Sequence, residues 1–303
     1  MLVVILSALA VISAKCSHKA ESSSTEGQSH VPQATPTPNQ PMSEPEIEIR
    51  DSLSNNDELL YSGFVVQKRR KRVKIDGGLR SSITADASYV VLQRNGKTVM
   101  KFDGIYHPMG NGAEFGLFSL FGGETKQLIV SLDSFRAGRQ WVVDLNESAR
   151  VIYDGNVWET GRETDDLGII DLDRDGRYEI TAPITDFYEL NDKMSMSQIP
   201  LPVIVFKYDE RKRAYQPANT HFPAYTLGNI SSDNERANGS PESTRSEPIR
   251  ILLDYVYAGK EKEGWALYNS RYRLSDKEEM RNRIKSILRR EPVYKFIYNQ
   301  PRK

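Results

Sequence analysis

The 303-residue chain contains a single cysteine, Cys16, and no excess of charge, because 41 Lys and Arg residues balance 41 Asp and Glu residues. One cysteine excludes an intrachain disulfide scaffold and a cysteine-rich zinc site. A net charge of zero provides no overall field that gathers nucleic acid, so we expect no nucleic-acid partner. Apolar residues make up 38% of the chain, so the fold has to rest on ordinary hydrophobic packing.

The N-terminus also lacks a hydrophobic run of the ~20 residues that a membrane-spanning helix needs. Instead, Leu2–Ala14 contains only apolar residues and serines, which fits the core of a secretory signal. Two interpretations of its processing remain open. Ile12-Ser13-Ala14 offers small residues for signal peptidase, whereas Ser13-Ala14-Lys15-Cys16 resembles a bacterial lipobox, in which Cys16 is lipidated, although Lys15 departs from that pattern. We therefore expect an exported protein that is periplasmic, anchored to the outer membrane through Cys16, or extracellular.

Residues 17–58 contain no aromatic residue but eight serines and five prolines. Such a segment cannot bury enough apolar area to offset the entropy of ordering, so it predicts a tether. Residues 228–247 have a similar composition and predict a linker between two folded regions. The expected organisation is a signal (1–16), a disordered tether (17–58), a β domain (59–227), a flexible linker (228–247) and a helical C-terminal region (248–303).

Residues 59–227 are rich in short β-prone runs that turn residues separate. Tyr89–Leu92 and Val99–Phe102 flank Asn95-Gly96, a dipeptide typical of a tight hairpin. Similar runs include Trp141–Leu145 and Val203–Tyr208, and none is long enough for a helix. We predict a mainly β fold, an antiparallel domain that is propeller-blade-like or sandwich-like, followed by a small helical region.

A weak internal duplication is visible within this region. Gly116–Gly123, which leads into Leu128–Val130, parallels Gly168–Gly176, which leads into Glu179-Ile180, at an offset of 52 residues. A unit of loop, strand and hairpin has the size of one propeller blade.

The second copy contains an acidic loop, Asp171-Leu172-Asp173-Arg174-Asp175-Gly176-Arg177-Tyr178-Glu179. Alternating carboxylates on a tightly curled loop supply the oxygens that Ca²⁺ prefers, and Gly176 permits the sharp bend. An EF-hand would need a Glu at loop position 12, but Ala182 stands there and the flanks are strand-like. The loop therefore predicts a calcium site of another kind.

This loop resembles the FG-GAP or VCBS type of calcium-binding β repeat, which reads Asp-x-Asp-x-Asp-Gly-x-x-Asp/Glu between two strands. Ser119, Phe121 and Gly123 stand where the first copy would need acids, so one clear loop and one degenerate copy are present. The resemblance implies one Ca²⁺ site, with the following ligands: the side chains of Asp171, Asp173, Asp175 and Glu179, and the backbone carbonyl of Arg177.

Two further sequence patterns lie outside the loop, one before it and one after it. The run Lys68–Arg72 contains five consecutive cations, which suit a solvated strand edge or hairpin tip, or an anionic partner such as anionic lipid, lipopolysaccharide or nucleic acid. Near the C-terminus, Ser275 and Glu278 have the spacing of a helix capping box. The helix that follows should bury one face, formed by Met280, Ile284, Ile287 and Leu288.

Two function classes are compatible with these patterns. We favour an exported, membrane-tethered binding or structural protein of the cell envelope that is not an enzyme, with a Ca²⁺-stabilised β domain and an unidentified envelope or extracellular ligand. The alternative is a hydrolase of envelope glycans that uses paired acids in a cleft. The candidate acids for that alternative are Glu163, Asp165, Asp166 and Asp186.

Overall fold

The computed structural model describes residues 57–76, 82–104, 111–134, 137–146, 148–160, 167–228 and 243–299. All of them belong to one unit of the chain, Pro41–Lys303. The predicted signal, the lipidation candidate Cys16 and nearly all of the predicted tether lie outside the described residues.

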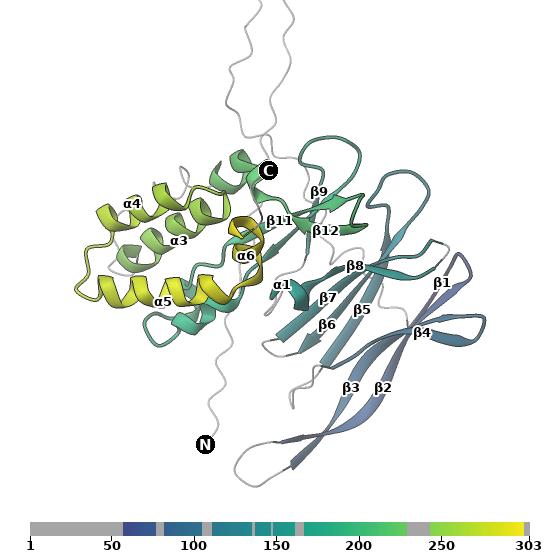
Figure 1. The fold of residues 1–303 in the computed structure, drawn as a ribbon. Coiled ribbons are helices and arrows are strands. Elements are labelled where there is room, and N and C mark those ends of the chain that lie inside the picture. Colours follow the sequence, from purple (N-terminus) through teal and green to yellow (C-terminus); the bar gives the residue numbers. More distant parts are fainter. Residues whose placement is uncertain are drawn as a thin grey trace, which may run out of the picture. The chain divides into compact units, whose positions relative to one another are not determined.

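The described residues contain twelve strands, which form three antiparallel sheets of four strands each, and in every sheet the neighbours in space are neighbours in sequence (Figure 1). The first sheet contains β1 (Glu58–Tyr61), β2 (Phe64–Asp76), β3 (Ser82–Arg94) and β4 (Lys97–Phe102). The second contains β5 (Asn111–Phe118), β6 (Gln127–Ser134), β7 (Ala137–Asp144) and β8 (Arg150–Asp154). The third contains β9 (Gly168–Ile170), β10 (Glu179–Pro183), β11 (Val203–Asp209) and β12 (Ala214–Pro217). The prediction of a mainly β fold with C-terminal helices is confirmed.

The predicted hairpin at Asn95-Gly96 joins β3 to β4. Asn95 and Gly96 have φ angles of 52° and 73°, the left-handed conformation that a tight hairpin turn with the strand twist requires. Asparagine and glycine adopt this conformation at the lowest cost, which explains why this turn could be located from the sequence.

A first hydrophobic core joins the first and second sheets. Phe64 and Leu92 of the first sheet belong to the same buried cluster as Phe115 and Val130 of the second. Phe102 and Trp141 are also in this cluster, with ring centroids 5.3 Å apart. Alternate residues of each strand point to the same side of its sheet, so these strands present an apolar face to one another.

A second, larger core joins the second and third sheets to the C-terminal helices. Its buried members include Val142, Phe206, Leu252, Tyr268 and Ile284. The helices and the third sheet therefore share a single hydrophobic core, and the predicted domain boundaries stay a prediction. Apolar faces that the sequence shows separately are buried against each other.

The helical region contains α3 (Ser243–Tyr257), α4 (Glu261–Arg271), α5 (Lys277–Arg290) and α6 (Pro292–Tyr298). Helix α3 begins at Ser243, inside the predicted linker. Gly259, with φ of 79°, lies in the break between α3 and α4. Gly264 lies inside α4, where a Cβ atom would come within 3.0 Å of the Leu252 carbonyl oxygen. This glycine allows two helices to approach closely and does not interrupt the helix.

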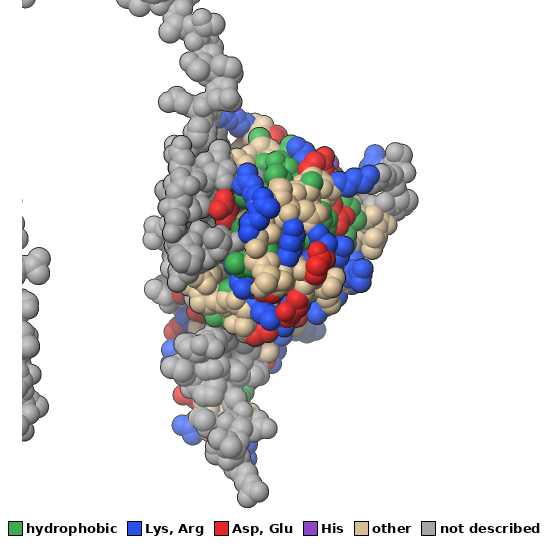
Figure 2. Space-filling model, turned by 90° about the vertical axis from the view of Figure 1, so that its left-hand side faces the viewer, with side chains coloured by type: hydrophobic (Ala, Val, Ile, Leu, Met, Phe, Trp, Pro, Cys, Tyr) green, Lys and Arg blue, Asp and Glu red, His purple; other side chains and the backbone are tan. Residues whose placement is uncertain are grey.

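Helix α5 buries the predicted face of Met280, Ile284, Ile287 and Leu288. The predicted capping box at Ser275 is wrong, because the helix starts one residue later and its N-cap is Asp276. The Asp276 carboxylate does not cap the helix but accepts hydrogen bonds from Arg245 and from the Tyr272 hydroxyl. On the helical face in Figure 2, basic and acidic side chains are interspersed, as on an ordinary solvated surface.

Shorter helical elements lie between strands or after the last strand. They are α1 (Gly155–Trp158) between β8 and β9, the 3₁₀ helices η2 (Asp186–Leu190) and η3 (Met196–Gln198) between β10 and β11, and η4 (Asn219–His221) after β12. Among the described residues, no helix combines the length and apolarity needed to cross a bilayer.

Candidate functional site: an acidic loop around Lys207

The predicted loop connects β9 to β10, and Asp171 organises it. One carboxylate oxygen of Asp171 accepts the backbone N–H of Asp175 at 3.1 Å, and the other accepts that of Gly176 at 3.0 Å. Arg174 and Gly176 have φ angles of 59° and 80°, so the chain turns back sharply within a few residues. The local sequence therefore forms the tight acidic loop that its spacing predicts.

Glu179 closes the loop at the first residue of β10. Its side chain is 1% exposed, and its Oε2 accepts the backbone N–H of Leu172 at 2.9 Å. Burial raises the pKa of Glu179 above its usual range, and the hydrogen bonds from Leu172 and Lys207 offset that effect only in part. A buried carboxylate of this kind needs a positive charge nearby.

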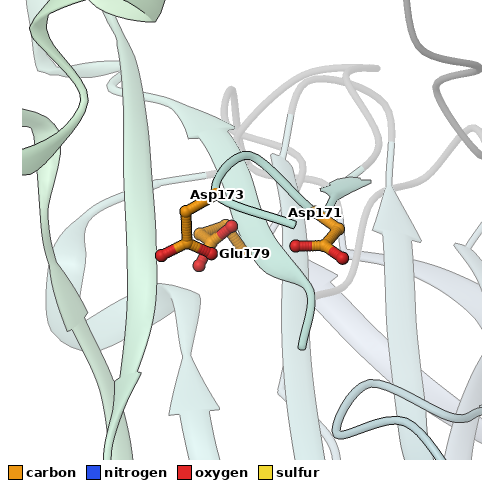
Figure 3. Close-up of side chains that lie close together, drawn as sticks. All are labelled: Asp171, Asp173 and Glu179. Atoms are coloured by element: carbon orange, nitrogen blue, oxygen red, sulfur yellow. The ribbon is translucent and has the colours of Figure 1, made fainter. Parts of the chain in front are cut away.

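Three of the four predicted acidic ligands converge. Asp171, Asp173 and Glu179 each have a carboxylate oxygen within 4.8 Å of the others (Figure 3). Asp175 is not part of this group. Its Oδ1 accepts the N–H of Arg177 at 2.8 Å, so one of its oxygens is committed to the loop backbone.

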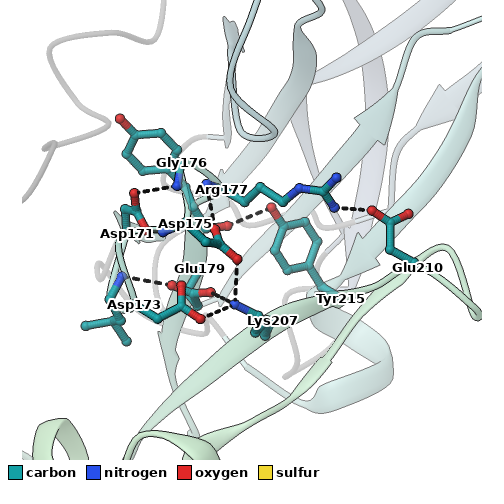
Figure 4. Close-up of polar contacts among 11 residues, drawn as sticks. Asp171, Asp173, Asp175, Gly176, Arg177, Glu179, Lys207, Glu210 and Tyr215 are labelled. Carbon is teal, nitrogen blue, oxygen red and sulfur yellow. Dashed lines mark hydrogen bonds and ion pairs between the residues drawn. The ribbon is translucent and has the colours of Figure 1, made fainter.

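A residue from another strand supplies a positive charge to this cluster. The ammonium of Lys207 on β11 lies 3.1 Å from Asp175 Oδ2 and 3.1 Å from Glu179 Oε1, and it also donates to Asp173 Oδ2 (Figure 4). Lys207 thus contacts three carboxylates at once.

The ionisation states of these groups support one another. Desolvation opposes the charge of Lys207, but hydrogen bonds to its three acidic partners outweigh it and raise the pKa of Lys207 well above its usual range. Slight burial of Asp175 is likewise outweighed by the Arg177 N–H and by Lys207, which lower the pKa of Asp175. At neutral pH, Lys207 is therefore an ammonium facing carboxylates.

The donor set also fits a hard divalent cation. Carboxylate oxygens within 4.8 Å of one another can all reach a common Ca²⁺, because Ca–O bonds are about 2.3–2.6 Å long. One ammonium does not balance the formal charge of Asp171, Asp173, Asp175 and Glu179. Because Lys207 lies against three of these carboxylates, calcium could reach them only if the lysine side chain moved away.

Lys207 is the residue that sequence reasoning missed. It occurs in Val203–Asp209, a strand whose central residues, 204–206, are buried. A single cation in a run of apolar residues was the signal available in the sequence. Its partners could not be identified, because they lie 28 or more residues away and depend on the pairing of β10 with β11.

Arg177 enters the network through its N–H and its guanidinium, which forms an ion pair with Glu210. The hydroxyl of Tyr215 donates to the carbonyl of the next residue, Tyr178, at 2.9 Å. These contacts attach the end of the loop to β12 and to the turn between β11 and β12. The role predicted for the Arg177 carbonyl, as a calcium ligand, stays a prediction.

A hollow of about 560 Å³ lies beside Lys207, within the size range of ligand pockets. Its walls come from the β11–β12 hairpin, η4 and α6. The ammonium of Lys212 lies 4.9 Å from the centre of the Phe296 ring, so one wall combines a cation with an aromatic ring. The other charged or imidazole side chains of the lining are Lys207, Asp209, Arg211 and His221.

The acids proposed for a hydrolase are only partly described. Glu163, Asp165 and Asp166 lie outside the described residues, and Asp186 is buried at the start of η2. Another buried acid, Glu291, has its pKa raised to about 7 by burial. It accepts the backbone N–H of Val293 at 2.7 Å and acts as the N-cap of α6, which is a structural role.

No protein-family model, curated protein or solved structure matches this chain.

Proposed function

We propose that the protein is an exported, membrane-tethered binding or structural protein of the cell envelope, whose β9–β10 loop is held in shape by a cation. The apolar run Leu2–Ala14 supports export, and the convergence of Asp171, Asp173 and Glu179 supports the cation. The oxygens of these acids accept hydrogen bonds from the loop backbone or from Lys207. Such contacts are those of a structural loop, and the hollow beside Lys207 offers a surface for a ligand.

Calcium and the Lys207 ammonium are alternative cations in this proposal. With the lysine in place, the carboxylates are partly neutralised. Calcium brings two charges and six to eight coordination positions, so it can displace one ammonium from a cluster of four acids. The loop then behaves as a calcium site whose affinity is weakened by a competing residue of the same chain.

Calorimetric titration of Ca²⁺ into the chelator-treated protein, with Mg²⁺ as the control ion, tests this proposal. We expect one saturable Ca²⁺ site in the wild type and at least ten-fold tighter binding in Lys207→Met, which keeps the aliphatic stem but removes the competing charge. Lys212→Met is the matched control, because Lys212 lies on the same hairpin and contacts Gln216 and Phe296 instead of the loop. Asp173→Ala should abolish binding.

If neither the wild type nor Lys207→Met binds calcium at 10 mM, the loop is not a calcium site and Lys207 is its cation. The tether is tested separately, by growing cells with a radiolabelled fatty acid. Labelled protein in the membrane fraction, lost in Cys16→Ser, would support lipidation. An unlabelled wild-type protein would favour cleavage after Ala14.

A further inference from the structure

The polybasic run lies in a part of the first sheet where, among the described residues, β2 and β3 pair with each other and with no third strand. β2 and β3 pair along their whole length, from Phe64↔Arg94 to Asp76↔Ser82. In contrast, β1 pairs with β2 only as far as Gln67, and β4 pairs with β3 only from Val90 onward. Residues 68–76 and 82–89 therefore form a two-stranded ribbon that extends beyond the sheet.

Strand geometry gathers four cations on one face of this ribbon. Alternate residues of a strand point to the same side at a spacing of about 7 Å. The residues concerned, which we call the basic face, are Lys68, Arg70, Arg72 and Lys74. Their partners on β3 at the last three positions are Ser88, Asp86 and Thr84. Only one of these is an acid, so the face has a clear excess of positive charge.

The charges on the basic face are poorly neutralised. Arg72 lies 3.7 Å from Asp86, and the two side chains are 84% and 71% exposed, so the pair contributes little. Within the described part of the chain, the side chains of Lys68, Arg70 and Lys74 form no hydrogen bond or ion pair with another residue.

The opposite face of the ribbon differs, although it also carries cations. Lys71 lies 2.7 Å from Asp103, and Lys101 of β4 lies 2.6 Å from the same carboxylate. Both ammonium groups also lie over the ring of Tyr89, at 5.6 and 4.8 Å from its centre. β2 thus places only two cations on this face, of which Lys71 has an acidic partner and Arg69 donates to the amide oxygen of Gln67.

Protection of a strand edge does not explain this difference. Charges on either face of an edge strand discourage association with another sheet, so edge protection requires no row on one face. A straight row of cations spanning about 20 Å suits an extended anionic surface instead. We propose that the basic face binds the anionic headgroups of a lipid membrane. This inference rests on the proposed function in one respect, since a tether at Cys16 would keep the protein near such a membrane.

Binding to vesicles tests this inference without calcium and without the lipid anchor. The probe is the chain from residue 16 onward with Cys16→Ser, in buffer with chelator, mixed with phosphatidylcholine vesicles containing 30% phosphatidylglycerol. Each basic residue at an anionic membrane strengthens binding roughly five-fold, so we expect Arg70→Gln with Arg72→Gln to weaken sedimentation with these vesicles at least ten-fold. Binding should also fall steeply between 50 and 500 mM salt.

Lys262→Gln with Arg273→Gln is the matched control, since both residues are exposed in the helical region, and it should change binding less than two-fold. Lys68→Gln with Lys74→Gln gives a second test if the first variant has a lowered melting temperature. Equal binding to pure phosphatidylcholine, or equal losses in variant and control, would overturn the inference. So would tighter binding to a 20-base-pair DNA duplex than to the vesicles. These outcomes leave the calcium titration unaffected, so the two proposals fail separately.

Discussion

The turn between β5 and β6 and the loop between β9 and β10 share one contact and differ in charge. In the first, Gln127 Oε1 accepts the backbone N–H of Leu120 at 2.9 Å. In the second, Glu179 Oε2 accepts that of Leu172, also at 2.9 Å. Leu172 and Glu179 each lie 52 residues after their counterparts Leu120 and Gln127, which is the offset of the weak duplication in the sequence. A neutral amide is therefore sufficient to form this contact.

The difference lies in what faces each side chain across the sheet. Gln127 pairs with Asp144 of β7. In the third sheet Ile180 pairs with Phe206, so the preceding residue, Glu179, lies opposite Lys207. Gln127 Nε2 and Asp144 Oδ1 are buried and have no hydrogen-bond partner within the described residues. Glu179 therefore adds a negative charge that the shared contact does not require, and the Lys207 ammonium lies against that charge.

The strongest test of the comparison is to give the first turn a carboxylate. Gln127→Glu should lower the free energy of unfolding at pH 7 by about 4 kcal/mol, because a fully buried carboxylate would face the Asp144 side chain instead of an ammonium. Urea unfolding measures the loss. Adding Asp144→Lys should restore part of it by recreating the Glu179–Lys207 arrangement. A loss below about 1 kcal/mol would show that the two positions are not electrostatically different.

The two turns are also in contact with each other, and substitutions at two neighbouring glycines test how closely they are packed. The N–H of Tyr178 donates to the Leu120 carbonyl at 2.8 Å. A Cβ atom on Gly122 would lie 2.7 Å from the carbonyl oxygen of Gly176, so Gly122→Ala should cost about 3 kcal/mol. Gly123 has nearly the same φ, 72° against 69°, but open space around it, so Gly123→Ala should cost only about 1 kcal/mol. Equal melting temperatures for the two variants would contradict the contact.

Removing the internal cation should have a smaller effect. Lys207→Met leaves the buried Glu179 without its ammonium and should cost about 2 kcal/mol in chelator, less than a fully buried pair because Lys207 is 30% exposed. Glu179→Gln added to this variant should recover about 1 kcal/mol, since the amide needs no counter-charge. If the double variant is as unstable as Lys207→Met, Glu179 is not the group that requires the lysine.

The smallest effect concerns pH. Because burial raises the pKa of Glu179 in the folded state, the stability that this group contributes is fully present below its unfolded pKa of about 4.3 and declines as pH rises through the folded value. Glu179→Gln does not titrate. The stability of this variant relative to the wild type should therefore rise between pH 4 and pH 7, measured by urea unfolding at fixed ionic strength. A falling difference would mean that Lys207 outweighs burial.

The sequence by itself determined the features that depend on neighbouring residues. The Asn95-Gly96 hairpin, the mainly β fold and the buried face of α5 follow from turn chemistry and from the spacing of apolar residues. The acidic loop is also local, because Asp171 and Glu179 bond to the backbone of the same loop. The capping box was the local prediction that failed, since Asp276 takes the N-cap position.

Only the tertiary structure decided which distant groups meet. Strand pairing brings Lys207 to Glu179, and the fold brings Asp103 to Lys71 of the polybasic run. Packing also merges the helices with the third sheet into one core. Each of these outcomes depends on the alignment of segments far apart in the chain. An apolar or charged pattern indicates that a side chain needs a partner, but it does not identify the residue that becomes this partner.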